Sequence, residues 1–222
     1  MIVVLDGPAG TGKSTVSREI AARLGLSFLD TGAMYRAMTH WLLQNGVDVD
    51  DADAVALASA KPVILSGTDA SGPTITVDGV DVSGPIRGAA VTAAVSAVSA
   101  VPEVRVRMVD LQRHSAEEAP VGIVAEGRDL GTVVFPDADL KVFLTASAGI
   151  RAVRRAAQLG VTGPEQIAAI LADIERRDAA DSGRATSPLA KADDAIEVDT
   201  SAMEPEEVIT HILGLVRQRV HA

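Results

Sequence analysis

Short, continuous apolar runs alternate along this chain with longer stretches in which apolar residues recur at helical spacing. The short runs are residues 2–5, 26–29, 121–125, 140–144 and 195–198. The helical patterns cover residues 13–24, 34–45, 102–118, 149–158, 164–180 and 204–220. A short run that is apolar on both faces is typical of a strand in a parallel sheet. The alternation therefore predicts an α/β fold, with a mostly parallel sheet covered by helices on both faces.

Residues 62–86 interrupt this rhythm. Their β-branched or apolar segments are residues 63–65, 74–77 and 80–82. Asp78-Gly79 separates the last two segments, and an Asp-Gly pair between alternating residues is a strong hairpin signal. We therefore expect a small antiparallel insertion here. The next stretch, residues 89–100, is rich in Ala, Val and Ser and is expected to form an ordinary buried helix.

The composition allows one domain with a full core and excludes several kinds of chemistry. The 222 residues are 47% hydrophobic but only 2% aromatic, so aliphatic side chains must fill the core. There is no cysteine, which excludes a disulfide framework, thiolate zinc sites and a cysteine nucleophile. The four histidines lie far apart without metal-ligand spacing, so we expect no histidine metal site. They are His40, His114, His211 and His221.

The charge and the N-terminal run bear on partners and location. A formal net charge of −10 argues against non-specific binding to nucleic acid or to anionic membranes. The N-terminal run lacks a basic region and is too short for a signal peptide, and no later run reaches the ~20 apolar residues of a membrane helix. We therefore expect a cytoplasmic protein without nucleic-acid or membrane partners. We also expect a monomer. An anionic substrate would need a positive site that is built locally.

A phosphate-binding pattern, G-x-x-x-x-G-K-[ST], lies between the first predicted strand and the first predicted helix. It is matched by Gly7-Pro8-Ala9-Gly10-Thr11-Gly12-Lys13-Ser14. Glycines let successive backbone N–H groups turn toward phosphate oxygens, and the helix dipole adds positive potential. Lys13 is expected to reach the β- and γ-phosphates of a nucleotide, Ser14 to ligate Mg²⁺, and Thr15 to contact the α-phosphate. The pattern identifies a P-loop but leaves the acceptor open, water included.

Residues 30–36 follow the second apolar run and open a helix. They contain Asp30, Tyr35 and Arg36, which could hold an anionic ligand. Alternatively, Asp30 serves only as an N-cap and Tyr35 only as a packed ring. The segment by itself does not decide between anion binding and a structural role.

Residues 126–132 come directly after the run at residues 121–125 and place Arg128-Asp129 between two glycines. Ligands of open α/β sheets bind beyond the carboxyl ends of the strands. We therefore take the pair as a candidate for ligand binding, against the alternative of an ion pair in a surface turn.

A dense arginine zone stands out in this otherwise acidic chain. Its members are Arg151, Arg154, Arg155, Arg176, Arg177 and Arg184. Guanidinium groups suit bidentate phosphate contacts and can stabilise the charge of a phosphoryl transition state. The alternative is a solvated helix face with i,i+4 ion pairs.

Taken in order, these motifs closely resemble the bacterial cytidylate kinase family of nucleoside monophosphate kinases. The resemblance covers nearly the whole chain, and the strings that carry it are residues 7–15, 30–36, 81–87, 127–138 and 177–194. The strings containing Phe135-Pro136-Asp137 and Ser187-Pro188-Leu189 are specific to this family among the monophosphate kinases.

The resemblance implies a P-loop NTPase three-layer fold with a central five-stranded parallel sheet, an inserted antiparallel monophosphate-binding domain and a helical lid. The implied core is residues 1–33, 89–150 and 190–222. The monophosphate-binding region, which includes the insertion at residues 62–86, is about residues 34–88, and the lid with its flanking helices is about residues 151–189.

The resemblance also implies the site residues. Thr31, Tyr35, Ser96, Arg105 and Asp129 would line a cytosine pocket. Arg36, Arg128 and Arg184 would hold the acceptor phosphate, while Arg177 and Asp181 would reach the ribose. Arg151, Arg154 or Arg155 would approach the ATP phosphates from the lid. Lys13, Arg128, Arg177 and Arg184 would act in catalysis.

The implied reaction is reversible transfer of the γ-phosphoryl group of ATP to CMP or dCMP with Mg²⁺. No general base is expected, because the acceptor phosphate is already an anion at neutral pH. Glu126 stands where family members carry Asp or Glu, and its water-mediated link to Mg²⁺ stays open. Ala180 and Ser182 replace arginines of some members, which puts more weight on Arg177 and Arg184. A P-loop kinase for another small acceptor, such as shikimate, and a switch that slowly hydrolyses nucleotide are the alternatives.

Overall fold

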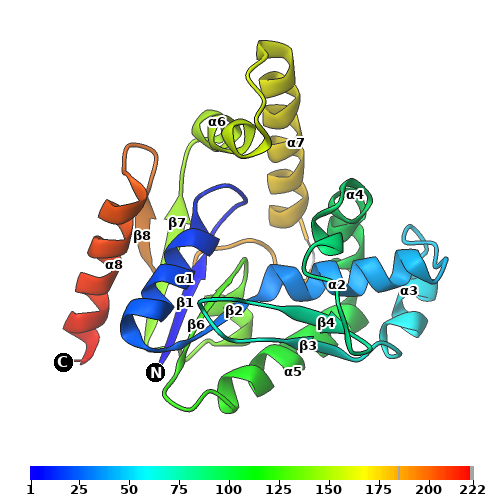
Figure 1. Ribbon diagram of the computed structural model, residues 1–222, viewed down its shortest axis with the longest axis horizontal. Coiled ribbons are helices and arrows are strands. Elements are labelled where there is room, and N and C mark those ends of the chain that lie inside the picture. Colours follow the sequence, from blue (N-terminus) through cyan, green and yellow to red (C-terminus); the bar gives the residue numbers. More distant parts are fainter. Residues whose placement is uncertain (185, 221–222) are drawn as a thin grey trace.

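The computed structural model describes residues 1–184 and 186–220, and a five-stranded sheet lies at its centre (Figure 1). The strand order is β2-β6-β1-β7-β8, and each neighbouring pair is parallel. The strands are β1 (Ile2–Asp6), β2 (Ser27–Asp30), β6 (Ile123–Gly127), β7 (Leu140–Thr145) and β8 (Ile196–Asp199). The five-stranded parallel sheet is confirmed, and the carboxyl ends of its strands share one edge.

Two helix layers cover the faces of this sheet. The helices are α1 (Lys13–Leu24) and α8 (Pro205–Val220) on one face, and α2 (Thr31–Gln44) and α5 (Pro102–Glu117) on the other. Successive side chains of a strand point to opposite faces, so Val3 and Leu5 pack in one layer and Val4 in the other. All three side chains are fully buried, which explains why the strand is apolar without alternation.

Strand β6 begins and ends two residues later than its apolar run predicts. Its register pairs Leu5 with Glu126 and Asp6 with Gly127, so the ladder continues to the end of β1. Backbone pairing does not require an apolar side chain, and a buried carboxylate is therefore carried within the strand. The expectation that residues 126 and 127 follow the strand is wrong.

The insertion forms the antiparallel sheet that the Asp-Gly pair predicts. Its strands, in spatial order, are β3 (Ile64–Ser66), β4 (Ile75–Val77) and β5 (Val80–Asp81). Asp78 and Gly79 join β4 to β5 with φ of 51° and 79°, a left-handed pair typical of a two-residue hairpin turn. The Asp78 carboxylate also accepts the amide of Val63 (2.8 Å) and the indole N–H of Trp41 (2.9 Å), which ties the turn to α2.

Helix α3 (Ala52–Ser59) is absent from the sequence prediction. It has only eight residues, and three of them are buried. Asp51 caps it by accepting the amides of Asp53 and Ala54, both at 3.1 Å. A local N-cap of this kind is a readable signal, but the apolar pattern is too short to identify the helix.

Helix α4 (Ala89–Val98) is half-buried. Val91, Val95 and Val98 form a buried stripe, whereas most of its alanines are exposed. The expectation of an ordinary buried helix is therefore wrong for one face. Across the part of the chain that the structure describes, no single helix is long and apolar enough to cross a membrane. Helices α4 and α5 pass that test only as a pair, and they meet at 101°.

Helices α6 (Ala148–Leu159) and α7 (Pro164–Ser182) pack against each other beyond the carboxyl edge of the sheet (Figure 1). Both agree with the predicted helical patterns to within two residues. A 3-10 turn, η1 (Pro85–Arg87), and a π-helix, η2 (Leu130–Val134), are also present, and the sequence predicts neither. Single-turn π-helices are frequent at functional sites, so η2 directs attention to this edge.

Candidate active site

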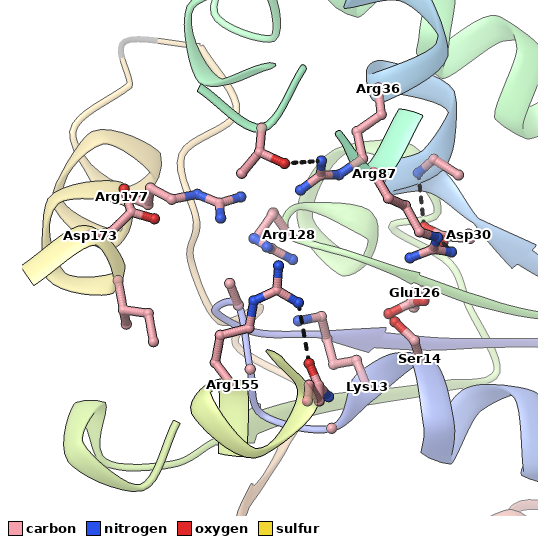
Figure 2. A pocket seen from close by; sticks show the side chains of 18 of the residues that line it. Lys13, Ser14, Asp30, Arg36, Arg87, Glu126, Arg128, Arg155, Asp173 and Arg177 are labelled. Carbon is pink, nitrogen blue, oxygen red and sulfur yellow. Dashed lines mark hydrogen bonds and ion pairs between the residues drawn. The ribbon is translucent and has the colours of Figure 1, made fainter. Parts of the chain in front are cut away.

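A cavity of about 590 Å³ opens at the carboxyl edge of the sheet, between the loop after β1, helix α2, the turn η1 and helices α6 and α7. Figure 2 shows that basic side chains from several elements point into it. They are Lys13, Arg36, Arg87, Arg128, Arg155 and Arg177. The chain as a whole has a net charge of −10. The cavity is therefore a local concentration of positive charge of the kind that an anionic substrate would need.

The loop after β1 has the backbone of a phosphate cradle. Gly7, Gly10 and Gly12 have φ of 143°, 83° and 92°, which favour glycine. A Cβ on Gly7 would lie 2.1 Å from the carbonyl oxygen of Leu144, so no other residue fits there. The loop residues that line the cavity are Ala9, Gly10, Gly12, Lys13, Ser14 and Thr15, whereas Gly7, Pro8 and Thr11 do not line it.

Lys13 is the first residue of α1, and its side chain folds back over the loop. Its ammonium donates to the carbonyl oxygen of Pro8 at 2.8 Å. Burial, followed by the nearby Arg128 guanidinium, lowers the pKa of Lys13 to about 7. A bound phosphate would favour the charged form, so the lysine is placed to gain electrostatic energy when an anion enters.

The carbonyl groups of the loop are held from behind. Arg151 donates from Nη1 to the carbonyl oxygen of Ala9 at 3.1 Å, and the Thr200 hydroxyl lies 3.2 Å from that of Thr11. Arg151 also pairs with Asp178 of α7 at 2.6 Å. Carbonyls bonded outside the loop are turned away from the cavity, which favours inward-facing N–H groups.

Two of the three lid arginines expected at the ATP phosphates do not line the cavity. Arg151 is occupied behind the loop, and Arg154 donates to the backbone oxygen of Thr200 at 2.6 Å. Only Arg155, one helical turn after Arg151, lines the cavity. Tertiary hydrogen bonds direct the Arg151 and Arg154 side chains elsewhere, which favours Arg155 among the three candidates. The contact of Arg155 with ATP stays a prediction.

Replacing Arg151 with methionine is expected to lower the free energy of unfolding by about 3 kcal/mol, because Asp178 would lose its ion-pair partner. It should also raise KM for ATP, since the Ala9 carbonyl would no longer be held. Denaturant unfolding and donor kinetics measure the two effects.

Arg176→Met is the matched control, because the Arg176–Asp173 pair is exposed and such pairs contribute at most about 1 kcal/mol. Equal stability of the two variants would contradict the role of Arg151 as a brace.

Three arginines from separate elements form the far end of the cavity. Arg36 of α2 donates to the carbonyl oxygen of Ile86 (3.2 Å) and to the Thr92 hydroxyl (2.9 Å). Burial is the main cause that lowers the pKa of Arg36 to about 10, and the charge of Arg177 is the second. The pKa of Arg177 is lowered in the same way, by burial first and by the charge of Arg128 second. Guanidinium groups that repel one another in a partly dry site favour the binding of an anion such as phosphate.

Asp181 of α7 joins Arg128 to a further arginine, Arg184. Its carboxylate accepts from Nε of Arg128 at 3.1 Å and from Arg184, which also donates to the Ser99 hydroxyl at 2.9 Å. The carbonyl oxygen of Ser99 in turn accepts a hydrogen bond from Arg105 (3.1 Å). Ser96, the serine that the resemblance implies, only accepts the Ser99 hydroxyl through its backbone oxygen. Sequence reasoning misses Ser99, for which the chain carries no recognisable signal.

Tyr35, Arg105 and Asp129 form a closed cluster that does not line the cavity. Arg105 is 3% exposed and Asp129 6%, and the two form an ion pair. The Arg105 guanidinium lies 5.5 Å from the centre of the Tyr35 ring, and burial raises the pKa of Tyr35 to about 12. Nearby, the Thr31 hydroxyl donates to the carbonyl oxygen of Glu126 at 2.7 Å, so this side chain serves a backbone contact.

Oxygen atoms suited to a hard cation gather next to the loop. Glu126 lies beside Ser14 in Figure 2, and its Oε1 is buried without a hydrogen-bond partner. Burial, followed by Asp30, raises the pKa of Glu126 to about 7. Asp30 accepts the Ala33 amide at 2.9 Å and so caps α2. These oxygens fit a divalent ion that takes its other ligands from phosphate and water.

Within residues 1–184 and 186–220, no group of three or more His, Asp or Glu side chains could hold a metal ion. Of the histidines considered from the sequence, His221 lies outside the described residues. Two charged residues that line the cavity, Arg87 and Asp173, are absent from the sequence-based site. Arg87 lies 4.0 Å from Asp30, and only the fold brings η1 next to the start of α2.

Comparison with known proteins agrees with this geometry. The family model of cytidylate kinase matches residues 3–218. The chain belongs to the cytidylate kinase family. Cytidylate kinase of Streptomyces griseus subsp. griseus is 60% identical over 216 residues, which cover 97% of this chain and 92% of that protein. Cytidylate kinase of Rhodococcus opacus is 54% identical over 220 residues, which cover 99% and 96%.

A solved structure of an uncharacterized protein from Eubacterium ventriosum resembles the fold of this cytidylate kinase family member. The TM-score is 0.52 with 12% sequence identity, and the match covers 98% of each chain. At this identity the likeness concerns the fold alone. The family string at residues 127–138 begins at the last residue of β6 and runs through η2.

Proposed function

We propose that this protein transfers the γ-phosphoryl group of ATP to CMP or dCMP, giving ADP and the corresponding diphosphate. The observation that carries the proposal is the pairing, across one cavity, of a P-loop with a separate arginine cluster in a member of the cytidylate kinase family. The P-loop accounts for the donor phosphates, and the second cluster accounts for an acceptor that is itself an anion. A nucleotide hydrolase would need no such second site.

At the donor end, the backbone N–H groups of the loop and the Lys13 ammonium would bind the ATP phosphates, and Arg155 would approach them from the lid. Mg²⁺, held by Ser14 directly and by Glu126 directly or through water, would neutralise phosphate charge when bound. The buried, unpaired Oε1 of Glu126 supports this assignment. Thr15 lines the same part of the cavity and would contact the α-phosphate.

At the acceptor end, Arg36 and Arg128 would hold the monophosphate, and both line the cavity. Arg184, the third arginine that the resemblance implies for this phosphate, does not line it, whereas Arg177 does and would assist. Asp181 would keep Arg128 and Arg184 in position. Asp181 and Arg177 would also reach the ribose. Thr31 and Ser96 stay predictions as base contacts. The Thr31 hydroxyl donates to the Glu126 backbone oxygen, and Ser96 accepts the Ser99 hydroxyl only through its backbone oxygen.

The base would enter next to Tyr35, Arg105 and Asp129. Cytosine presents an amino donor beside ring acceptors, so a carboxylate and a guanidinium are complementary to it. Uracil would set a carbonyl oxygen against the Asp129 carboxylate and leave buried polar groups unpaired, which is how polar sites reject analogues. For CMP to bind here, the base would have to reach Arg105 and Asp129, which form a closed ion pair with each other.

Catalysis would depend on positioning and electrostatics. The acceptor phosphate is already an anionic nucleophile, so no side chain has to remove a proton. Lys13 and the cavity arginines would stabilise the charge of the transferring group, and closure of α6 and α7 would exclude water. The division into core, monophosphate-binding region and lid, the monomeric state and the cytoplasmic location stay parts of this proposal.

A coupled assay of ADP release with CMP, dCMP, UMP, AMP and shikimate tests the proposal. CMP and dCMP should support fast, Mg²⁺-dependent ADP release, with UMP at least about tenfold poorer in kcat/KM. Preference for shikimate or AMP would contradict the acceptor assignment. ADP release that is independent of any acceptor would instead identify a nucleotide-hydrolysing switch.

A further inference from the structure

Asp6 is a buried carboxylate that joins the donor loop to the acceptor side of the site. It is the last residue of β1, directly before Gly7 of the P-loop, and its side chain is 5% exposed. Its Oδ1 accepts the amide of Leu130 at 3.0 Å, and its Oδ2 accepts that of Gly131 at 2.8 Å. Both oxygens therefore bind the first two N–H groups of η2, at the positive end of that turn.

This contact changes what Asp129 can do. Asp129 is the N-cap residue of η2, and an Asp in that position normally accepts an amide of its own helix. Here Asp129 makes no side-chain cap, and the first two amides of η2 are bound by Asp6 instead. The carboxylate of Asp129 is instead directed to Arg105.

The position of η2 is also fixed by close packing. A Cβ on Gly131 would lie 3.2 Å from Cδ of Lys141 and 3.5 Å from both Oδ2 of Asp6 and Cβ of Ala192. At the other end of the turn, Arg113 donates to the carbonyl oxygens of Val134 (2.9 Å) and Val133 (3.0 Å). With both ends held, the backbone that carries Arg128 and Asp129 has little freedom.

We propose that Asp6 is a positioning residue that caps η2 in place of Asp129 and so frees the Asp129 carboxylate to recognise the nucleobase of the acceptor. The inference rests on the proposed function, since it assumes that Asp129 reads the base. Without the Asp6 cap, Asp129 would turn back to its own helix amides, and Arg128 would move with it. Donor binding would change little, because Asp6 does not take part in the hydrogen bonds that hold the loop. Its charge also influences Lys13 less than burial, Arg128 and Glu126 do.

Asp6→Asn tests this directly, because the amide keeps the shape but presents an N–H₂ group to one of the two amide donors. KM for CMP should rise about tenfold and the preference for CMP over UMP should fall about tenfold, whereas KM for ATP should stay within about twofold. Asp139→Asn is the matched control, since Asp139 accepts the Ile2 amide (2.7 Å) at the opposite end of β1. It should leave all three quantities unchanged.

Asp6→Glu separates position from charge. It keeps the carboxylate but displaces its oxygens by one methylene, so it should show the same pattern as Asp6→Asn. If KM for CMP and the base preference stay at wild-type values in both variants, or if KM for ATP rises in parallel with KM for CMP, the inference is overturned. A wild-type protein that does not phosphorylate CMP would overturn the proposed function instead.

Amide hydrogen exchange of the wild-type protein provides a readout that does not depend on how the variants fold. The Leu130 and Gly131 amides should exchange as slowly as the amides of β1 and β6, because a buried carboxylate holds them. Exchange at the rate of an exposed loop would overturn the proposed cap.

Discussion

Lys13→Ala is expected to reduce kcat/KM by about 10²–10³-fold or more while the protein stays folded. The ammonium is the one cation supplied by the P-loop itself, and removal of a single preorganised donor to a developing charge costs this much in other enzymes. The fold should tolerate the change, because the only recorded hydrogen bond of the side chain is to the Pro8 carbonyl oxygen. Burial already disfavours the charged form, so alanine removes a desolvation cost.

Steady-state kinetics with CMP, together with thermal unfolding, measure both parts of this prediction. Lys61→Ala is the matched control, since Lys61 is an exposed lysine between α3 and β3. Near-normal turnover in Lys13→Ala would remove the P-loop from the mechanism. Loss of activity together with a large drop in the unfolding temperature would instead indicate a structural role for Lys13.

Substitution of Asp129 is expected to change both stability and base preference. Asp129→Ala would leave Arg105 buried without its partner, and breaking a buried ion pair in this way costs about 3–5 kcal/mol. The loss should be larger than average because Nε of Arg105 already lacks a hydrogen-bond partner. Glu19→Ala, which breaks the exposed pair of Glu19 with Arg23, should cost at most about 1 kcal/mol.

Asp129→Asn separates recognition from stability. The amide oxygen can still accept from Arg105, while the N–H₂ group presents a donor to the carbonyl oxygen of uracil. The preference for CMP over UMP should therefore fall by about 10–100-fold, with little change in KM for ATP. Unchanged selectivity in both Asp129 variants would show that this carboxylate does not read the base.

The two variants and those of Asp6 make a connected set. If Asp6 acts through Asp129, its substitution should reproduce the selectivity loss of Asp129→Asn but not the full stability loss of Asp129→Ala. The reason is geometric, since Asp6 contacts the η2 amides and Asp129 contacts Arg105. A double-mutant cycle would measure the coupling.

The sequence by itself determined the layered α/β architecture and the donor site. Apolar runs such as that of β1 indicate strands buried on both faces, and the Asp78-Gly79 pair fixes the hairpin of the insertion. The P-loop is equally readable, because its glycines, Lys13 and Ser14 act through local backbone geometry within one short segment. Features that are built within one short segment can therefore be predicted from the sequence alone.

Only the tertiary structure decided which distant side chains share the site. Arg151, Arg154 and Arg155 are equivalent in the sequence, yet only Arg155 lines the cavity, because the other two bind carbonyl groups on neighbouring segments. Ser99 and Asp6 acquire their roles through partners that are far away along the chain. Such contacts depend on how strands and helices are placed in space, and hydrophobic periodicity carries no information about them.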